Sequence, residues 1–241
     1  MLSALRKKLR VKQSVWDVLP SIPLLDTPLE KGDLFVLRNW NPRGFLTYQH
    51  AGMISDVSTL TRIDCTPKDG CRIKPFHRGQ QNKELFIARL PRDVPDREEI
   101  IREGINISTY LIQNHKITYL NLAQYRVEQL LRVLVGRCMG KVGWEELSDY
   151  IERFLSPYIH QTDYDSRTFA MFCNRFSMLI YQLAAWYVWT KNHKPNPEIS
   201  RLIHQYFAFH SKYCRPWHIL MLGQNEHHPW TVFRTTTWFN Q

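Results

Sequence analysis

The chain has 241 residues, of which 44% are hydrophobic and 13% aromatic, and its formal net charge is +10. This length suits one domain, or one domain with an extended end, and the apolar content can support a core, which excludes a disordered chain. The basic excess favours anionic partners. Apart from a cluster between Arg6 and Lys12, however, the charges are spread along the sequence, as on an ordinary solvated surface.

Two features bear on where the protein resides. No apolar run reaches the roughly 18 to 20 residues needed to cross a bilayer, and no apolar segment follows the basic N-terminus before Pro20 and Pro23. The five cysteines are an odd number, which argues against a disulfide framework and for a reducing compartment. We therefore expect no transmembrane segment and a protein that is cytoplasmic, or exported without a cleavable signal.

The first 90 residues are expected to be mostly β after an N-terminal segment, 1–30, made of a helix and a proline-containing lead-in. A loop marked by Pro42 and Gly44 is predicted over 39–48. Short runs rich in β-branched and aromatic residues predict five strands, at 33–38, 50–55, 59–64, 71–76 and 84–90.

The remainder is expected to be mostly helical. Apolar residues at helical spacing predict four helices, at 96–113, 122–140, 144–155 and 171–189. Pro157 is expected to end the third of them, and the aromatic tail after Pro195 receives no clear assignment. A β block followed by a helical block predicts an α+β fold.

Cys173 is the first candidate for chemistry, because it lies where a loop passes into the most apolar helix of the chain. A thiol in the first turn of a helix is exposed to the positive end of the helix dipole, which favours the reactive thiolate. Cysteine on an apolar helix is more often a small buried hydrophobe. Position alone therefore favours a structural role for Cys173.

His50 changes this balance, because a histidine paired with a cysteine at a helix start is a candidate base for nucleophilic catalysis. It begins a predicted strand beside Gly52, where another backbone or a substrate can approach closely. Asp64 lies on the next predicted strand, and a tight hairpin would place it roughly across from His50, where a carboxylate can orient the imidazole. Asp56 is the second choice because it lies at the turn.

Metal and cofactor chemistry are the competing interpretations. Cys214 and His218 lie four residues apart and His227 and His228 follow, but the paired spacing of a zinc finger is missing. No glycine-rich phosphate-binding motif is present. We expect neither a metal nor a cofactor.

Several segments together resemble the circularly permuted NlpC-type papain-like hydrolases, which include YiiX- and YebB-like bacterial proteins and have the lecithin:retinol acyltransferase-like enzymes as relatives. The resemblance covers roughly residues 31–90 and 164–187. It is carried by "KGDLFVLR", "TYQHAGMISD", "RIDCTPKDGCRIKPF", "ELFIARL" and "MFCNRFSMLIYQLA". It implies an antiparallel sheet packed against helices in a domain spanning 31–241, with a helical insertion at about 95–163.

The resemblance also implies roles for individual residues. His50 matches the base of that family and Cys173 the nucleophile, while Asp64 stands where permuted members often have Glu. Tyr48, two residues before the histidine, is expected to line the site, and Asn174 to contribute to substrate or oxyanion binding. Asn174 also marks a departure, since the family commonly has a small polar residue there.

The implied activity is acyl transfer through an acyl-thioester on Cys173, with a peptide or isopeptide amide or a lipid acyl ester as substrate. The sequence does not choose between these bonds. The alternative is a catalytically inactive papain-like protein that binds an anionic membrane or nucleic acid through a basic, aromatic surface. For the enzyme we expect weak contact with anionic membrane surfaces and no nucleic-acid partner.

Overall fold

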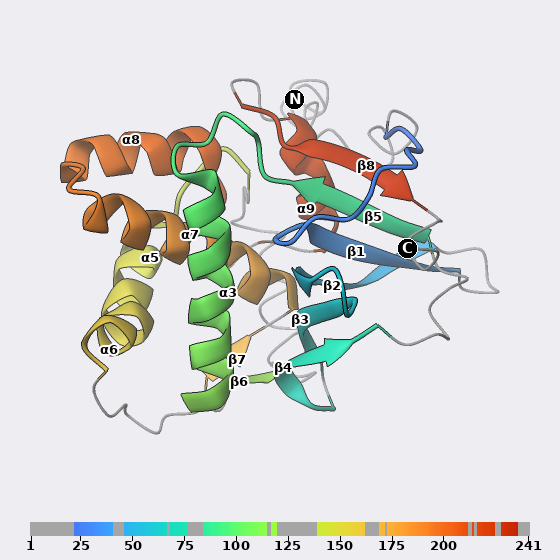
Figure 1. Cartoon of the computed structure of the whole chain (residues 1–241), viewed down its shortest axis with the longest axis horizontal. Helices are drawn as coiled ribbons and strands as arrows, with labels where there is room; N and C mark the ends of the chain where they lie inside the picture. The colour runs from blue at the N-terminus through green and yellow to red at the C-terminus, as the bar shows by residue number, and fades with distance from the viewer. Residues whose placement is uncertain are drawn as a thin grey trace, which may run out of the picture.

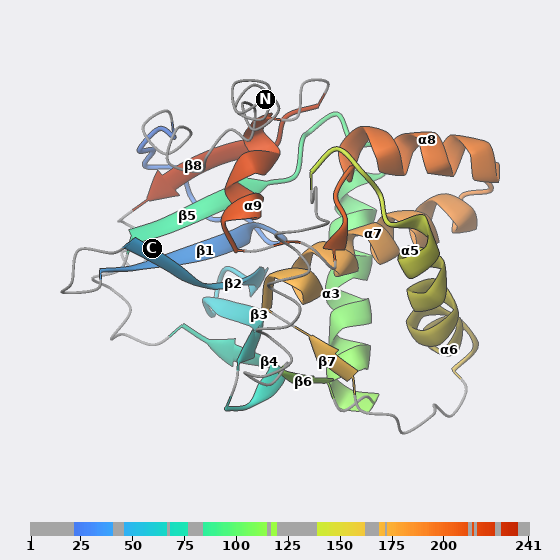
Figure 2. The same cartoon turned by 180° about the vertical axis from the view of Figure 1, so that it is seen from behind.

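A computed structural model gives the fold of the chain (Figures 1 and 2). The structure describes residues 22–40, 46–66, 68–76, 84–114, 117–119, 139–161, 169–171, 173–211, 214, 216–224 and 228–235. Among these residues no helix is long and apolar enough to cross a membrane.

A six-stranded antiparallel sheet forms one half of the molecule, with strand order β4-β3-β2-β1-β5-β8. The strands are β1 (Leu34–Trp40), β2 (Leu46–Asp56), β3 (Thr61–Thr66), β4 (Gly70–Pro75), β5 (Glu84–Arg89) and β8 (Thr231–Thr235). The first four are sequential neighbours joined as a meander, which is the arrangement that short connections favour. A separate parallel pair joins β6 (Ile117–Tyr119) to β7 (Phe169–Met171).

Most of the helices gather on one side of this sheet (Figures 1 and 2). They are α3 (Arg97–Asn114), α5 (Trp144–Tyr150), α6 (Ser156–His160), α7 (Cys173–Lys191), α8 (Asn196–Tyr206) and α9 (Pro216–Leu220), with a wide π turn at Ile151–Leu155 and a 3₁₀ turn at Met221–Gln224. The fold class is α+β, in agreement with the sequence prediction.

Helix α7 is the central element of the core. It packs along α3 and against β2 and β3, and nearly all its side chains are buried. Two of its buried polar side chains are paired inside the core: Tyr181 Oη donates to the Gly32 carbonyl, and Gln182 Nε2 donates to two carbonyl oxygens, of Phe207 at 3.0 Å and of Phe209 at 2.8 Å. Buried polar groups are tolerated only when paired in this way, so these contacts fix how α7 sits on the sheet.

The Gly-Asp pair before β1 has a structural explanation. Gly32 has φ +88°, and a Cβ there would lie 2.7 Å from Ile101 and 2.9 Å from Tyr181 Oη, so only glycine fits. Asp33 is buried and receives two hydrogen bonds from Arg89, at 2.9 and 2.8 Å. This bidentate ion pair joins the start of β1 to the end of β5.

Three sequence predictions are corrected by the structure. Strand β2 begins at Leu46, inside the segment 39–48 predicted as a loop, because its backbone pairs with β1. The helical stretch does not end at Pro157, which lies in the first turn of α6, where a missing N–H costs nothing. The unassigned tail contributes α8, α9 and the edge strand β8. The predicted helices in 1–30 and 122–140 lie almost entirely outside the described residues.

The cysteines also differ from expectation. Cys65, Cys71 and Cys173 are free and buried, whereas Cys214 is disulfide-bonded to a partner outside the described residues. The odd number of cysteines argued against a disulfide framework, and Cys214 departs from that expectation.

Candidate functional site

The β2–β3 hairpin brings His50 and Asp64 into contact. Strand register places Asp64 opposite Gly52, so His50 lies two residues along on the same face and reaches Asp64 diagonally. His50 Nε2 is 2.7 Å from Asp64 Oδ2. The predicted pairing of these two residues is confirmed. The Phe35 ring occupies the space that a side chain at position 52 would need, since a Cβ on Gly52 would lie 2.6 Å from it. Packing within the sheet therefore explains this glycine.

Asp64 is fully buried and surrounded by cations. Arg62 Nε forms an ion pair with Oδ2 at 2.7 Å, and Lys74 Nζ with Oδ1 at 3.2 Å. Burial by itself would raise the pKa of the Asp64 carboxyl, yet the hydrogen bond from His50 and the nearby positive charges hold the pKa below its usual value. The carboxylate is therefore ionised at neutral pH and accepts a hydrogen bond from His50 Nε2–H.

The Cys173 sulfur lies within interaction range of the His50 ring. Because Asp64 occupies Nε2, Nδ1 is the ring nitrogen left for the sulfur. Burial would lower the pKa of the imidazole, but the interactions with Asp64 and Cys173 outweigh it and raise the pKa of His50 to about 9. The ring is thus held as an imidazolium between a carboxylate and the Cys173 sulfur. Two residues that are far apart in the sequence therefore lie close together in the fold.

Cys173 is the first residue of α7. The helix has 19 residues, and the free N–H groups of its first turn and its dipole both favour negative charge at this end. The buried side chain of Asn174 follows, and its Nδ2 has no hydrogen-bond partner in the part of the chain that the structure describes. Arg175 turns away from this group and pairs with Glu146 and Tyr150 on α5.

Access to this cluster is restricted. Cys173 is 2% exposed and the His50 side chain 17%. The residues just before each of them in the chain, Phe172 and the side chains of 41–49, lie outside the described residues.

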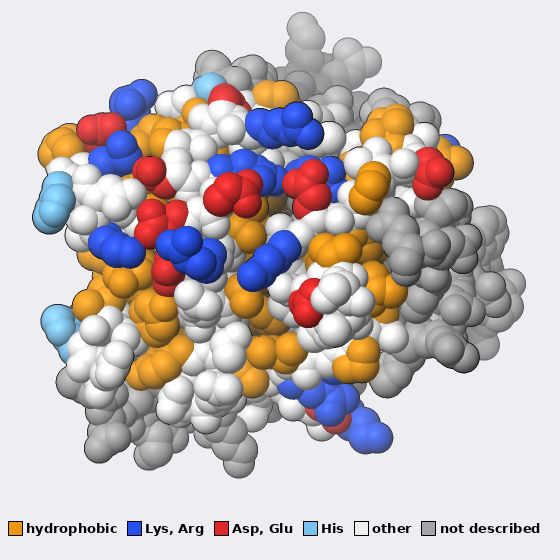
Figure 3. Space-filling model, viewed as in Figure 1, with side chains coloured by type: hydrophobic (Ala, Val, Ile, Leu, Met, Phe, Trp, Pro, Cys, Tyr) orange, Lys and Arg blue, Asp and Glu red, His pale blue; other side chains and the backbone are white. Residues whose placement is uncertain are grey.

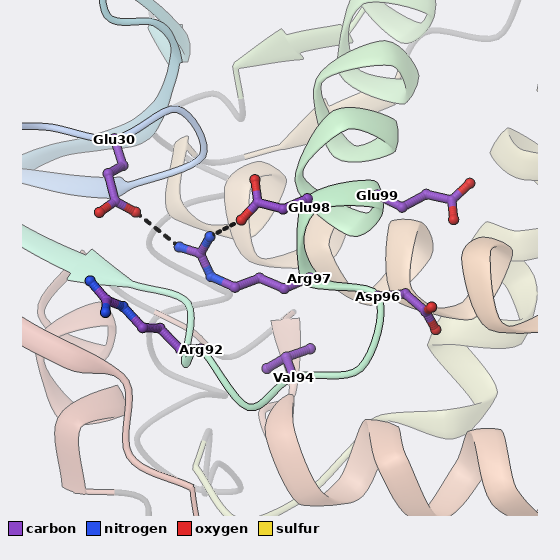
Figure 4. Close-up of a pocket in the computed structure, with 7 residues that line it drawn as sticks. All are labelled: Glu30, Arg92, Val94, Asp96, Arg97, Glu98 and Glu99. Carbon is purple, nitrogen blue, oxygen red and sulfur yellow. Dashed lines mark hydrogen bonds and ion pairs between the residues drawn. The ribbon is translucent and has the colours of Figure 1, made fainter.

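A cavity of about 650 Å³ lies elsewhere, at the start of α3 (Figure 4). Its lining residues are Glu30, Arg92, Val94, Asp96, Arg97, Glu98 and Glu99. Its lining contains no Cys, Ser, Thr or His, and Arg97 bridges two of its carboxylates. Acidic and basic side chains are intermixed over this face of the molecule, with no large area of one sign (Figure 3). We therefore assign the chemistry to the Cys173 cluster and not to this cavity.

The remaining sequence predictions for the site concern Asp56, Tyr48 and a metal. Asp56 caps the β2–β3 turn through Ser58 and Thr59, which leaves Asp64 as the partner of His50. Tyr48 lies on β2, but its side chain is outside the described residues. Among the residues that the structure describes, no group of His, Cys, Asp or Glu could hold a metal ion.

Sequence reasoning missed the two cations that hold Asp64. Their signal was available: Arg62 precedes Asp64 by two residues on the same strand, and Lys74 is paired with Arg62 across β3 and β4. All three side chains therefore share one sheet face. Without a known register this pattern looks like an ordinary solvated face.

Comparisons of the chain with protein-family models, with curated proteins and with solved structures find no match.

Proposed function

We propose that this protein is a cysteine-dependent hydrolase or acyltransferase of permuted papain-like type, acting through an acyl-thioester on Cys173. One observation carries the proposal: the His50 imidazole is hydrogen-bonded to a buried carboxylate and lies within interaction range of the helix-start sulfur of Cys173. This is the arrangement that nucleophilic catalysis by cysteine requires. The antiparallel sheet with α7 packed on β2 and β3 is compatible with it.

The proposed reaction starts from the ion pair in which the proton of the Cys173 thiol is already on His50. Asp64 fixes the ring and stabilises the imidazolium. The thiolate attacks the substrate carbonyl, and the imidazolium then donates its proton to the leaving amine or alkoxide as the acyl-thioester forms. Water or an acceptor nucleophile next gives its proton to His50 and attacks the thioester, which releases the thiolate and restores the ion pair.

The test is direct acylation of the protein. Activated esters of a short peptide and of a fatty acid should each be offered, because the bond class is open. One of them should leave its acyl group on the tryptic peptide 168–175, which contains Cys173, and hydroxylamine should remove it. Failure of both probes to acylate this peptide in the folded protein, with ready acylation after unfolding, would contradict the proposal.

Titration of His50 should give a pKa of about 9. Because this folded value lies above the unfolded value of about 6.5, protonation of His50 stabilises the fold fully below pH 6.5, and the contribution is lost as the pH rises through about 9. The ring resonances in NMR measure this, with His50→Gln identifying the signal. Cys173→Ala should lower the His50 pKa, since the sulfur is one of the groups that raise it. A His50 pKa at or below 6.5 would contradict the imidazolium.

Asn174 is proposed to bind the oxyanion, because its buried Nδ2, one residue after the nucleophile, has no hydrogen-bond partner among the described residues. Replacing Asn174 by leucine should lower kcat by about 10²–10³, as loss of one oxyanion donor does elsewhere. The same change should leave the free energy of unfolding unchanged or larger, because an unpaired buried amide is costly. Parallel losses of stability and activity in urea unfolding and turnover assays would instead mark Asn174 as structural.

The near-complete burial of Cys173 favours a second candidate function, a catalytically inactive papain-like protein that binds anionic membrane or nucleic acid. This protein would show strongly salt-dependent affinity for anionic vesicles or nucleic acid. That affinity would survive Cys173→Ala, and neither acyl probe would label the chain.

A further inference from the structure

Two further cysteines face each other beneath the candidate site and play no part in the proposed mechanism. Cys65 on β3 is paired in register with Cys71 on β4, at the end of the hairpin where the chain turns between Thr66 and Gly70. Both are free thiols, 0% and 8% exposed. They belong to the core cluster that contains Ile63 and Cys173.

The hydrogen-bond pattern of the hairpin determines how closely these cysteines approach. Phe76 N donates to Leu60 O at 3.0 Å, which makes that pair a hydrogen-bonded one. Antiparallel pairs alternate between the two types, so the next pair, Thr61 with Pro75, is non-hydrogen-bonded, as the missing N–H of proline requires. Counting on through the register, Cys65 with Cys71 is again a non-hydrogen-bonded pair.

Non-hydrogen-bonded pairs are the close ones, with Cα atoms about 4.5 Å apart. This spacing lies inside the range of about 4.4–6.8 Å that a disulfide spans. The two thiols are also close enough to interact with each other. Bond formation therefore needs no rearrangement of the two strands.

We propose that Cys65 and Cys71 are a redox-active dithiol that closes to a cross-strand disulfide on reaction with a small disulfide such as glutathione disulfide. The thiolate of Cys71, on the edge strand, attacks one sulfur of glutathione disulfide and releases one glutathione thiolate. The thiolate of Cys65 then attacks the Cys71 sulfur and releases the second. The two protons lost by the protein thiols are taken up by the two glutathione thiolates, so two protein thiols are oxidised and one disulfide is reduced.

A hydrogen bond joins Cys65 to the segment just before α7. Cys65 Sγ–H donates to the carbonyl of Met171 at 3.6 Å, and Met171 lies two residues before Cys173. Closing the disulfide removes this donor.

Burial and the neighbouring thiol raise the pKa of Cys71 well above its usual value. The thiolate needed for the first step is therefore scarce at neutral pH, and oxidation should quicken as the pH rises.

The experiment is peptide mapping of the unmodified full chain after equilibration in glutathione buffers, from fully reduced to fully oxidised. Remaining thiols are alkylated during denaturation, and trypsin then separates Cys65 on peptide 63–68 from Cys71 on peptide 69–72. We expect the two alkylated peptides to be replaced by one disulfide-linked pair as the buffer becomes oxidised. Alkylated Cys65 and Cys71 in every buffer would overturn the proposal, and so would a link from either peptide to 168–175.

Two variants separate this site from the proposed catalysis. Cys173→Ser should still form the 63–68 to 69–72 link, because the dithiol does not depend on the nucleophile. Cys71→Ser should lose the link while Cys173 stays available for acylation. Loss of the link in Cys173→Ser would show that oxidation proceeds through Cys173 and would also overturn the proposal.

Discussion

Replacing Cys173 by alanine should abolish acyl transfer, with a fall in kcat of about 10⁶ where the wild-type rate can be followed that far. The size of the effect follows from the mechanism, since without the sulfur no thioester can form. Turnover of whichever ester acylates the wild-type protein measures it. The matched control is Cys65→Ala, which removes another buried free thiol from the same core cluster and should retain activity within about tenfold.

The two variants together separate chemistry from packing. Each deletes one buried sulfur, and such a deletion usually costs stability through the cavity that it leaves. If the two variants lost activity equally, the loss would reflect a disturbed core. Activity retained in Cys173→Ala would end the proposed mechanism.

Replacing Asp64 by asparagine should lower both activity and stability. An amide can no longer stabilise the imidazolium of His50, and the equivalent change in a serine protease triad lowers kcat by about 10⁴. It also leaves the buried Arg62 without its countercharge, and removing one partner of a buried ion pair typically costs about 3–5 kcal/mol. Turnover and urea unfolding measure the two effects.

Asp56→Asn is the control for this experiment, because the sequence offered Asp56 as the second partner for His50. Asp56 is half-buried, and its hydrogen bonds with described residues stay within its own turn, so its replacement should leave both turnover and the His50 pKa unchanged. A larger loss of turnover in Asp56→Asn than in Asp64→Asn would contradict the arrangement in which Asp64 orients the ring.

The pH dependence of Asp64→Asn gives a further check on the same contact. The pKa of Asp64 is held below its usual value in the folded protein. Its ionised form therefore contributes stability at neutral pH that is lost as the pH falls through the folded pKa. The stability difference between wild type and variant should accordingly shrink in acid.

Several features of the protein could be predicted from local sequence. The strand segments follow from runs of β-branched and aromatic residues, and α7 follows from its continuous apolar composition between 173 and 189. The hairpin that pairs His50 with Asp64 was also within reach, because its short turn restricts the register. Local patterns are informative here because the backbone hydrogen bonds involved are close in sequence.

The tail shows where this reasoning fails. Residues 231–235 alternate weakly and gave no assignment, yet they form β8 by pairing with β5. Their partner strand, β5, lies about 140 residues earlier in the chain. The edge of β5 to which they bind exists only once the sheet has folded. Pro157 was misinterpreted for a related reason, since a proline that ends one helical segment can equally begin the next.

By itself the sequence determined the α+β class, the hairpin with its histidine and carboxylate, and the placement of a cysteine at a helix start. Only the tertiary structure decided that Cys173 meets His50, that Arg62 and Lys74 enclose Asp64, and that the Asn174 amide has no hydrogen-bond partner within the described part of the chain. The physical reason is that these contacts join side chains from segments that no local pattern connects. Their pKa values and hydrogen bonds exist only once the core has packed α7 against the sheet.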